Sequence, residues 1–273
     1  MAYVYPGDGS LDYMPCRYGR SRLLFRGPRC DLVGRYAVVL GGIEAYGRYI
    51  PQPYPALVQA GLDLPVVNLG CPNAGPDAWL NDPAVMEIVS RAVVTVVQVP
   101  GAADLTNRLY SVHQRRNDRF LRASPVLQAV YRGVDFTDFS FTRHMLRSLF
   151  EVGPERFALV ADELRAAWRA RMGALLAGIR GKAVLLWMAE QAPGPRHDAP
   201  MGEPLLVDAA MLDAVVERAD VLVTVTPAVP TRWKELEGMV FPAMAEPAAR
   251  GLPGVMAHED VAAALLPVLR GMV

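Results

Sequence analysis

Three short apolar runs, each leading into a loop that contains glycine, constrain the fold of this chain more than any other feature. They span Tyr36–Gly42, Pro65–Gly70 and Val93–Val99. Continuous apolar runs of this length are typical of strands buried on both faces. Segments of helical length separate them, Tyr54–Gly61 and Pro83–Arg91. This alternation predicts right-handed βαβ crossovers and a mostly parallel sheet.

The second half of the chain continues the alternation. Pro154–Gly181 keeps apolar residues at helical spacing and ends in glycine, and Lys182–Met188 is the next strand. Ala209–Ala219 is a predicted helix, Asp220–Val225 a fifth strand and Glu259–Arg270 a last helix. With 273 residues, the chain suits one domain. We expect a flavodoxin-like, three-layer α/β/α fold around a five-stranded, mostly parallel sheet.

Two segments stand outside this pattern. Residues 1–35 are rich in Gly, Pro, Tyr and Arg without a period, which predicts an ordered N-terminal arm. Its aromatic residues would be buried either on the chain's own sheet or on a second copy, so a homo-oligomer stays open. Residues 101–153 are too long for an ordinary βα connection. They predict an insertion with short helices of its own, and a lid is one role for it.

Composition excludes several classes of function. Lys+Arg 28 against Asp+Glu 28 gives a formal net charge of +0, so the chain lacks the basic field that nucleic-acid binding needs. A leader and an apolar run of membrane-spanning length are also missing, so we expect no membrane partner. The cysteines, Cys16, Cys30 and Cys71, have no metal-ligand spacing and fit a reducing, cytoplasmic compartment. This spacing gives no reason to expect a metal, and we expect no cofactor because phosphate-loop and dinucleotide glycine patterns are absent.

The segment VVLGGIEAYGRYIPQPYPALVQAGLDLPVVNLGCPNAG resembles the opening of the SGNH (GDSL-like) hydrolases. In that family a first strand ends in Gly-Asp-Ser, a Tyr-Gly pair follows, and a second strand ends near an oxyanion-hole glycine. Gly41 matches the family glycine, Gly42 stands at its Asp and Ile43 at its nucleophilic Ser; Tyr46 begins the Tyr-Gly pair. Isoleucine has neither a proton to lose nor a lone pair, so the covalent chemistry of the family cannot use this position.

The later blocks of the family pattern are matched in part. The resemblance implies that a backbone N–H beside Gly70 polarises an oxyanion, with Asn73 in the same loop; a tight βα turn is the alternative. Asn107 is a poorly spaced substitute for the asparagine of the third block. Before the last predicted helix, His258 matches the catalytic histidine, while Val255 stands in the Asp position.

Three more residues complete the candidate catalytic set. Asp260 or Glu44 would orient His258 in place of the lost Asp, because a carboxylate on Nδ1–H fixes the tautomer. Cys71 follows the second strand and is an alternative nucleophile, since a thiolate attacks well at neutral pH. Helix capping for His258 and a structural role for the Cys71 thiol are the competing interpretations.

Arginines gather in the arm and in the insertion of an otherwise neutral chain. Arg115 and Arg116 belong to the second cluster, and their guanidinium groups suit a phosphate, sulfate or carboxylate. Solvated arginines paired with nearby Asp residues are the alternative. The predicted ligand contacts are Gly42, Ile43, Tyr46, Gly70, Asn73, Asn107, Arg115 and Arg116.

Over its whole length the chain resembles an uncharacterised bacterial family of unknown function, through the arm GDGSLDYMPCRYGRSRLLFRGP and the runs RRNDRF and DFTDFSFTRHML. That resemblance implies no activity. Two hypotheses follow for function. One is an SGNH-like esterase or acyltransferase acting on an anionic or acylated carbohydrate-type ligand. The other is a non-catalytic ligand-binding or assembly protein that kept the fold after Ile43 replaced the reactive side chain.

Overall fold

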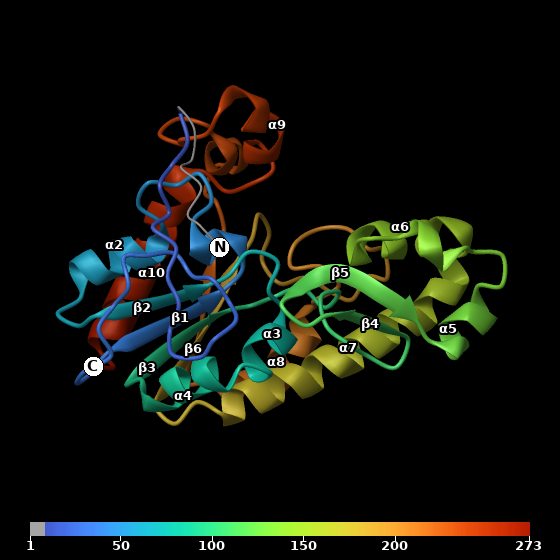
Figure 1. Ribbon diagram of the computed structural model, residues 1–273, viewed down its shortest axis with the longest axis horizontal. Helices are drawn as coiled ribbons and strands as arrows, with labels where there is room; N and C mark the ends of the chain where they lie inside the picture. The colour runs from blue at the N-terminus through green and yellow to red at the C-terminus, as the bar shows by residue number, and fades with distance from the viewer. Residues whose placement is uncertain (1–8) are drawn as a thin grey trace.

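The computed structural model describes residues 9–273 (Figure 1). Its centre is a parallel five-stranded sheet of order β2-β1-β3-β6-β7, the flavodoxin-like order when these strands are numbered along the chain. The predicted α/β fold with a five-stranded parallel sheet is confirmed. The strands are β1 (Ala37–Gly41), β2 (Val66–Gly70), β3 (Val94–Gln98), β6 (Lys182–Met188) and β7 (Val221–Val225).

Helices cover both faces of the sheet, as the apolar runs require. Val38 and Leu40 of β1 join the core on one face, and Ala37 and Val39 join the core on the other. Both faces of the strand are therefore dry, which explains why its sequence does not alternate. The second face is covered by α2 (Tyr54–Gly61) and α10 (Val255–Arg270), and the first by α3 (Pro76–Leu80), α4 (Pro83–Arg91), α7 (Pro154–Ala177) and α8 (Ala209–Val216).

The described part of the N-terminal arm packs on its own domain. Tyr18, Leu23 and Phe25 are buried in the core on the α4 side of the sheet. Arg26 donates hydrogen bonds to the carbonyl oxygens of Tyr46, Gly47, Ile50 and Pro51, which fixes the loop after the short helix α1 (Ile43–Tyr46). Two of the arm's aromatic side chains, Tyr18 and Phe25, are therefore buried against their own chain.

The insertion contains a hairpin that its sequence did not predict. Strands β4 (Tyr110–His113) and β5 (Arg116–Ala123) pair antiparallel, where short helices alone were expected. The polar sequence RNDRFLRA of β5 conceals the strand, because its buried positions include Asn117 as well as Phe120. In Figure 1 this region extends away from the sheet along α7. It continues through α5 (Pro125–Val130), a 3-10 turn at Phe136–Asp138 and α6 (Thr142–Val152).

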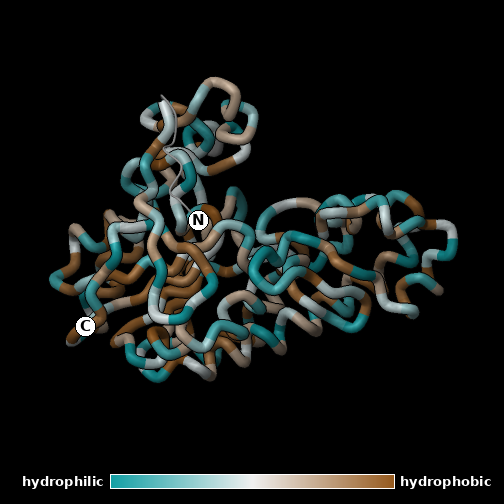
Figure 2. Tube along the Cα trace, in the orientation of Figure 1, coloured by the Kyte–Doolittle hydropathy of each residue, from teal (hydrophilic) through white to brown (hydrophobic). Residues whose placement is uncertain are grey.

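Most predicted boundaries agree with the structure, and one difference bears on function. Helix α10 begins at Val255 rather than Glu259, so His258 lies inside its first turn and not before it. Before α10 the chain forms a small lobe with two 3-10 turns, Pro230–Lys234 and Ala243–Ala245, and α9 (Glu246–Ala249) (Figure 1). Figure 2 shows hydrophobic residues concentrated along the sheet and hydrophilic ones frequent in both projecting regions. Within residues 9–273, no helix combines the length and apolar character needed to cross a bilayer.

Candidate ligand-binding cavity

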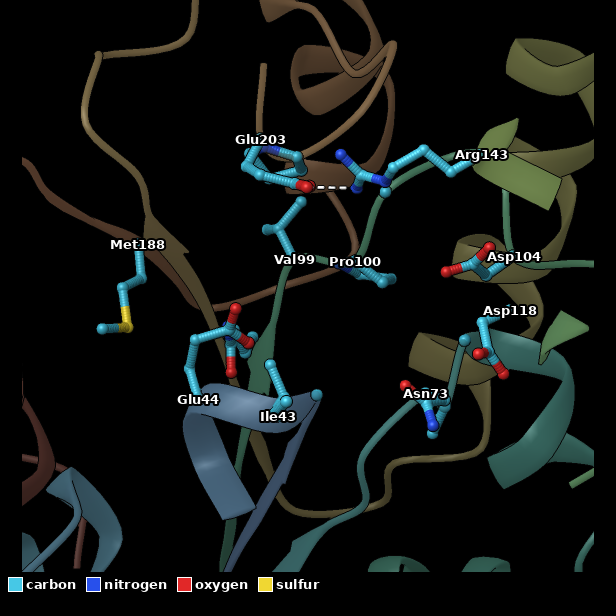
Figure 3. Close-up of a pocket in the computed structure, with 16 residues that line it drawn as sticks. Ile43, Glu44, Asn73, Val99, Pro100, Asp104, Asp118, Arg143, Met188 and Glu203 are labelled. Atoms are coloured by element: carbon cyan, nitrogen blue, oxygen red, sulfur yellow. Dashed lines mark hydrogen bonds and ion pairs between the residues drawn. The ribbon is translucent and has the colours of Figure 1, made fainter. Parts of the chain in front are cut away.

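A cavity of about 260 Å³ lies at the carboxyl ends of β1, β3 and β6 (Figure 3). Strand order reverses between β1 and β3, and in open α/β sheets ligands bind outside the carboxyl ends of the strands at such a switch point. The insertion and the loop after β6 complete the walls. The ionisable and amide side chains of the lining are Glu44, Asn73, Gln98, Asp104, Asp118, Arg143 and Glu203.

Carboxylates dominate the charge of this cavity. Arg143 forms an ion pair with Glu203, and it is the only cationic side chain of the lining within the described residues. Glu44, Asp104 and Asp118 have no ion-pair partner in that part of the chain. The cavity is therefore rich in hydrogen-bond acceptors and favours groups that donate hydrogen bonds or carry positive charge.

Asp104, in the loop after β3, is a lining carboxyl group with a raised pKa. Burial raises its pKa to about 6, and the negative charges of Asp118 and Glu203 act in the same direction. A hydrogen bond of 2.7 Å from Thr142 Oγ1 and the charge of Arg143 oppose this rise. At neutral pH Asp104 is thus mostly ionised yet easily protonated.

Asp118 brings β5 of the insertion into the site. Its Oδ1 is buried and has no hydrogen-bond partner among residues 9–273. Burial raises the pKa of this carboxyl group, while the charge of Arg116 lowers it. Because Asp118 and Arg143 both belong to residues 101–153, the insertion forms a wall of the cavity; movement of that wall as a lid stays a prediction.

Glu44 projects from α1 on the side of the cavity opposite Asp104 and Asp118 (Figure 3). Its Oε2 accepts a hydrogen bond of 2.9 Å from Gln98 Nε2, and Gln98 Oε1 accepts one of 3.3 Å from the Tyr54 hydroxyl. Gln98 and Tyr54 are both buried. The orientation of Glu44 is consequently fixed from within the core.

The turn after β2 does not offer the expected oxyanion donors. The N–H of Gly70 donates to Asn68 Oδ1 at 2.8 Å, and the N–H of Cys71 donates to the Gly41 carbonyl at 3.0 Å. Both N–H groups beside the predicted oxyanion position therefore already have hydrogen-bond acceptors within the protein. The alternative of a structural βα turn agrees with this geometry.

Asn117 of the hairpin holds the rest of that turn. Its Oδ1 accepts from the N–H groups of Gly75 and Ala78, and its backbone N–H donates to the Asn73 carbonyl. A Cβ atom on Gly75 would lie 1.9 Å from the Asp104 carbonyl oxygen. Only glycine permits this close approach, so the insertion and the turn pack as one unit around the cavity.

His258, the predicted base, is buried outside the cavity lining. Its Nδ1 accepts a hydrogen bond of 3.1 Å from the Tyr54 N–H, so this atom carries no proton for a carboxylate to accept. The expected carboxylate on Nδ1–H is therefore contradicted, and Asp260 instead accepts from Trp233 Nε1. Burial lowers the pKa of His258 to about 3, and the charge of Arg26 adds to this effect.

Cys71, the alternative nucleophile, is also enclosed. Burial raises the pKa of its thiol to about 11. The Sγ atom lies 3.8 Å from the Pro72 carbonyl oxygen, and the side chain is outside the cavity lining. The thiolate that nucleophilic attack requires is thus scarce at neutral pH.

Four predicted site residues line the cavity: Gly42, Ile43, Glu44 and Asn73. Others lie elsewhere. Asn107 Oδ1 caps its own turn through the N–H groups of Leu109 and Tyr110, and Arg115 and Arg116 are exposed at the hairpin tip. Tyr46 packs its ring 5.2 Å from that of Tyr13.

Sequence reasoning missed most of the polar groups of the cavity. The missed residues are Gln98, Asp104, Asp118, Arg143 and Glu203. Gln98 and Asp104 gave a usable signal, because they end or follow the third predicted strand, where ligands are expected. The other three come from segments whose course the sequence pattern does not determine.

The fold and the cavity define a class: an α/β protein with a parallel sheet and an acidic site at its switch point. A family model described as domain of unknown function DUF6473 matches residues 1–273. The chain therefore belongs to this family. A search of the curated proteins found no match.

Proposed function

We propose that the protein binds a small, hydroxyl-rich ligand of carbohydrate type, neutral or cationic, in the cavity beside β1 and β3. The acceptor-rich lining carries this proposal. Glu44, Asp104 and Asp118 supply carboxylate oxygens, and the amides of Asn73 and Gln98 stand beside them. Hydroxyl and ammonium groups are the donors that such a set of acceptors pairs with.

The charge of the lining argues against the anionic ligand expected from the arginine clusters. Arg115 and Arg116 are exposed at the hairpin tip, and Arg143 is already paired with Glu203. An anion in the cavity would face carboxylates that form no ion pair within residues 9–273, and the repulsion costs free energy. A neutral sugar avoids this repulsion, and a protonated amine reverses it.

We retain the SGNH-type relationship as a proposal for the fold alone. The sheet order and the position of the cavity support it. Ester hydrolysis and acyl transfer are not part of the proposal, because Ile43 has no nucleophilic atom and His258 is buried with Nδ1 occupied. The competing hypothesis of a ligand-binding protein on this fold is the one we adopt.

A second candidate function is proton transfer to or from the same ligand. The observation that favours it is the pKa of about 6 at Asp104, because a carboxyl group perturbed in this way within a cleft is often an acid–base catalyst. NMR spectra of D-glucosamine incubated with wild type and with Asp104→Asn would test it. New signals with wild type alone would support catalysis, and identical spectra would leave binding as the function.

The compartment and the assembly remain proposals as well. Cys16, Cys30 and Cys71 are free thiols, in keeping with a reducing, cytoplasmic compartment. A homo-oligomer was expected only if the arm covered a second copy, and its buried aromatic residues lie on its own core. We therefore propose a monomer in the cytoplasm, which sedimentation equilibrium of the full chain would check.

Binding would be tested by calorimetry and thermal shift with D-glucosamine, D-glucose and D-glucuronate at millimolar concentration. We expect affinity to fall in that order, because the acidic lining favours a cationic ligand over a neutral one and a neutral one over an anion. A tighter ligand should also raise the melting temperature more. Asp118→Asn should reduce the preference for glucosamine over glucose, and the exposed Asp213→Asn on α8 serves as the matched control. Preference for glucuronate, or no binding of any of the three, would contradict the proposal.

A further inference from the structure

The buried amide of Gln98 reaches the cavity through a space that only glycine leaves open. Gln98 ends the central strand β3, and its side chain lies across Gly41 of the neighbouring strand β1. A Cβ atom on Gly41 would lie 2.6 Å from Gln98 Oε1 and 2.5 Å from the Ala45 Cβ. Glycine at position 41 therefore makes room for a hydrogen-bonded side chain of the next strand.

The Tyr54 hydroxyl sets the orientation of this amide. Burial raises the pKa of Tyr54 well above its usual value, so the phenol keeps its proton and donates it to Gln98 Oε1. The Nε2 group then points to Glu44 Oε2. The reverse orientation would place the amide oxygen against the Glu44 carboxylate, where two acceptors repel each other.

His258 holds Tyr54 in turn. Tyr54 is the first residue of α2, and its N–H has no partner within that helix. His258 of α10 accepts this N–H at Nδ1, and its ring stacks on the Tyr54 ring with the centroids 5.9 Å apart. The histidine that resembles a catalytic base thus supports the aromatic ring that orients Gln98.

We infer that Tyr54 is a positioning residue, which acts through Gln98 to hold Glu44 as a specificity-determining hydrogen-bond acceptor of the cavity. Gln98 occupies Glu44 Oε2, which leaves Oε1 for a ligand donor. Figure 3 shows Glu44 on one side of the cavity and Asp104 and Asp118 on the other, so a ligand between them meets acceptors on both sides. The role in ligand selection rests on the proposed function, whereas the positioning itself does not.

A ligand-free experiment tests the positioning. The side-chain amide of Gln98 is assigned in ¹H–¹⁵N spectra of the full chain by its loss in Gln98→Met. We expect Tyr54→Phe and Glu44→Gln each to move this signal, because each removes one of the two hydrogen-bond partners of the Gln98 amide. Tyr36→Phe is the matched control, because it removes a buried hydroxyl that donates to the Ile88 carbonyl at the other end of the sheet. An unchanged Gln98 signal in Tyr54→Phe would overturn the inference.

A double-mutant cycle with D-glucosamine as the probe tests the consequence for binding. Glu44→Gln should weaken binding about tenfold, because a charge-assisted hydrogen bond becomes a neutral one. Tyr54→Phe should weaken it about threefold in wild type and not further in the Glu44→Gln background, because coupled residues are non-additive. Equal effects of Tyr54→Phe in both backgrounds would contradict positioning through Glu44. If wild type does not bind glucosamine, the proposed function fails, and the NMR result alone decides the positioning.

Discussion

The two walls of the cavity, one at the strand ends and one from the insertion, differ in the residues that form them. At the strand ends the wall is largely backbone and apolar side chains, such as Gly42, Ile43 and Met188, with Glu44 and Gln98 as polar exceptions. The insertion supplies ionisable groups, Asp118 and Arg143, and is held in place by buried polar contacts. The wall that the SGNH resemblance marked as reactive is thus mainly a scaffold. The chemistry that the cavity offers comes largely from the inserted segment.

The largest expected effect concerns the scaffold. Trp168 of α7 is fully buried, and its Nε1 donates to the carbonyl of Pro100 at the end of β3. Trp168→Ala should lower the free energy of unfolding by about 3–5 kcal/mol, because it leaves a cavity and an unpaired carbonyl. Urea denaturation measures this loss. Leu159→Ala, on an exposed position of the same helix, should change stability by less than about 0.5 kcal/mol. Equal effects of the two would break the distinction between scaffold and surface.

The next effect concerns the anchor of the insertion wall. Asn117 is fully buried, and Asn117→Ala would remove the side-chain partner of the Gly75 N–H and of the His113 carbonyl, while the Ala78 N–H would keep only the Gly75 carbonyl. We expect a loss of about 2–3 kcal/mol. Hydrogen exchange should accelerate in residues 73–78 and in the hairpin while the central strands stay protected. Asn107→Ala, which removes a more exposed turn cap, should cost less. Uniform acceleration across β1, β3 and β6 would show that the walls do not act separately.

The same contrast explains what could be predicted from sequence. The sheet was predictable because its strands are buried on both faces, and the apolar runs reveal this directly. The helix Tyr54–Gly61 and the strand Lys182–Met188 agree with their predicted bounds. Each of these elements carries its own local signal, so no knowledge of distant contacts was needed.

The insertion wall was not predictable because its buried contacts are polar and distant in sequence. Asn117 is 42 residues from Gly75, whose N–H it accepts in a hydrogen bond, and no sequence periodicity predicts such a pair. For His258 the error is different: the SGNH resemblance predicts a catalytic base, but the side chain is buried against α2. Local pattern predicts which segments pack, and it does not predict which side chains meet at the rim.

A smaller effect is expected from the pH dependence of stability. Burial raises the pKa of Asp104 from 3.8 to about 6, so between these values the folded protein binds more protons than the unfolded chain. The contribution of Asp104 to stability should therefore fall as pH rises from about 4 to 6, by less than the roughly 3 kcal/mol that two pKa units represent, because the side chain is partly exposed. Urea denaturation at several pH values gives the free energy of unfolding as a function of pH, and its slope should be shallower for Asp104→Asn than for wild type. Asp118 and Glu203 are present in both proteins, so the difference reports Asp104 together with its electrostatic coupling to these two groups. Identical slopes would mean that Asp104 is well solvated in the folded state.

The last prediction is that a substitution in the strand-end wall has no effect on ester hydrolysis, and it tests that wall directly. Ile43→Ser would restore a hydroxyl at the nucleophile position of the SGNH pattern, in the lining of the cavity. We expect wild type and this variant to release nitrophenol from p-nitrophenyl acetate only at the rate of the buffer blank. The Gly70 N–H donates to Asn68, and His258 is buried with a pKa lowered to about 3, so neither the oxyanion donor nor the base of the SGNH pattern is available. Hydrolysis by Ile43→Ser, lost again when His258→Ala is added, would contradict this expectation. It would mean that the strand-end wall lacks only a hydroxyl group to be reactive.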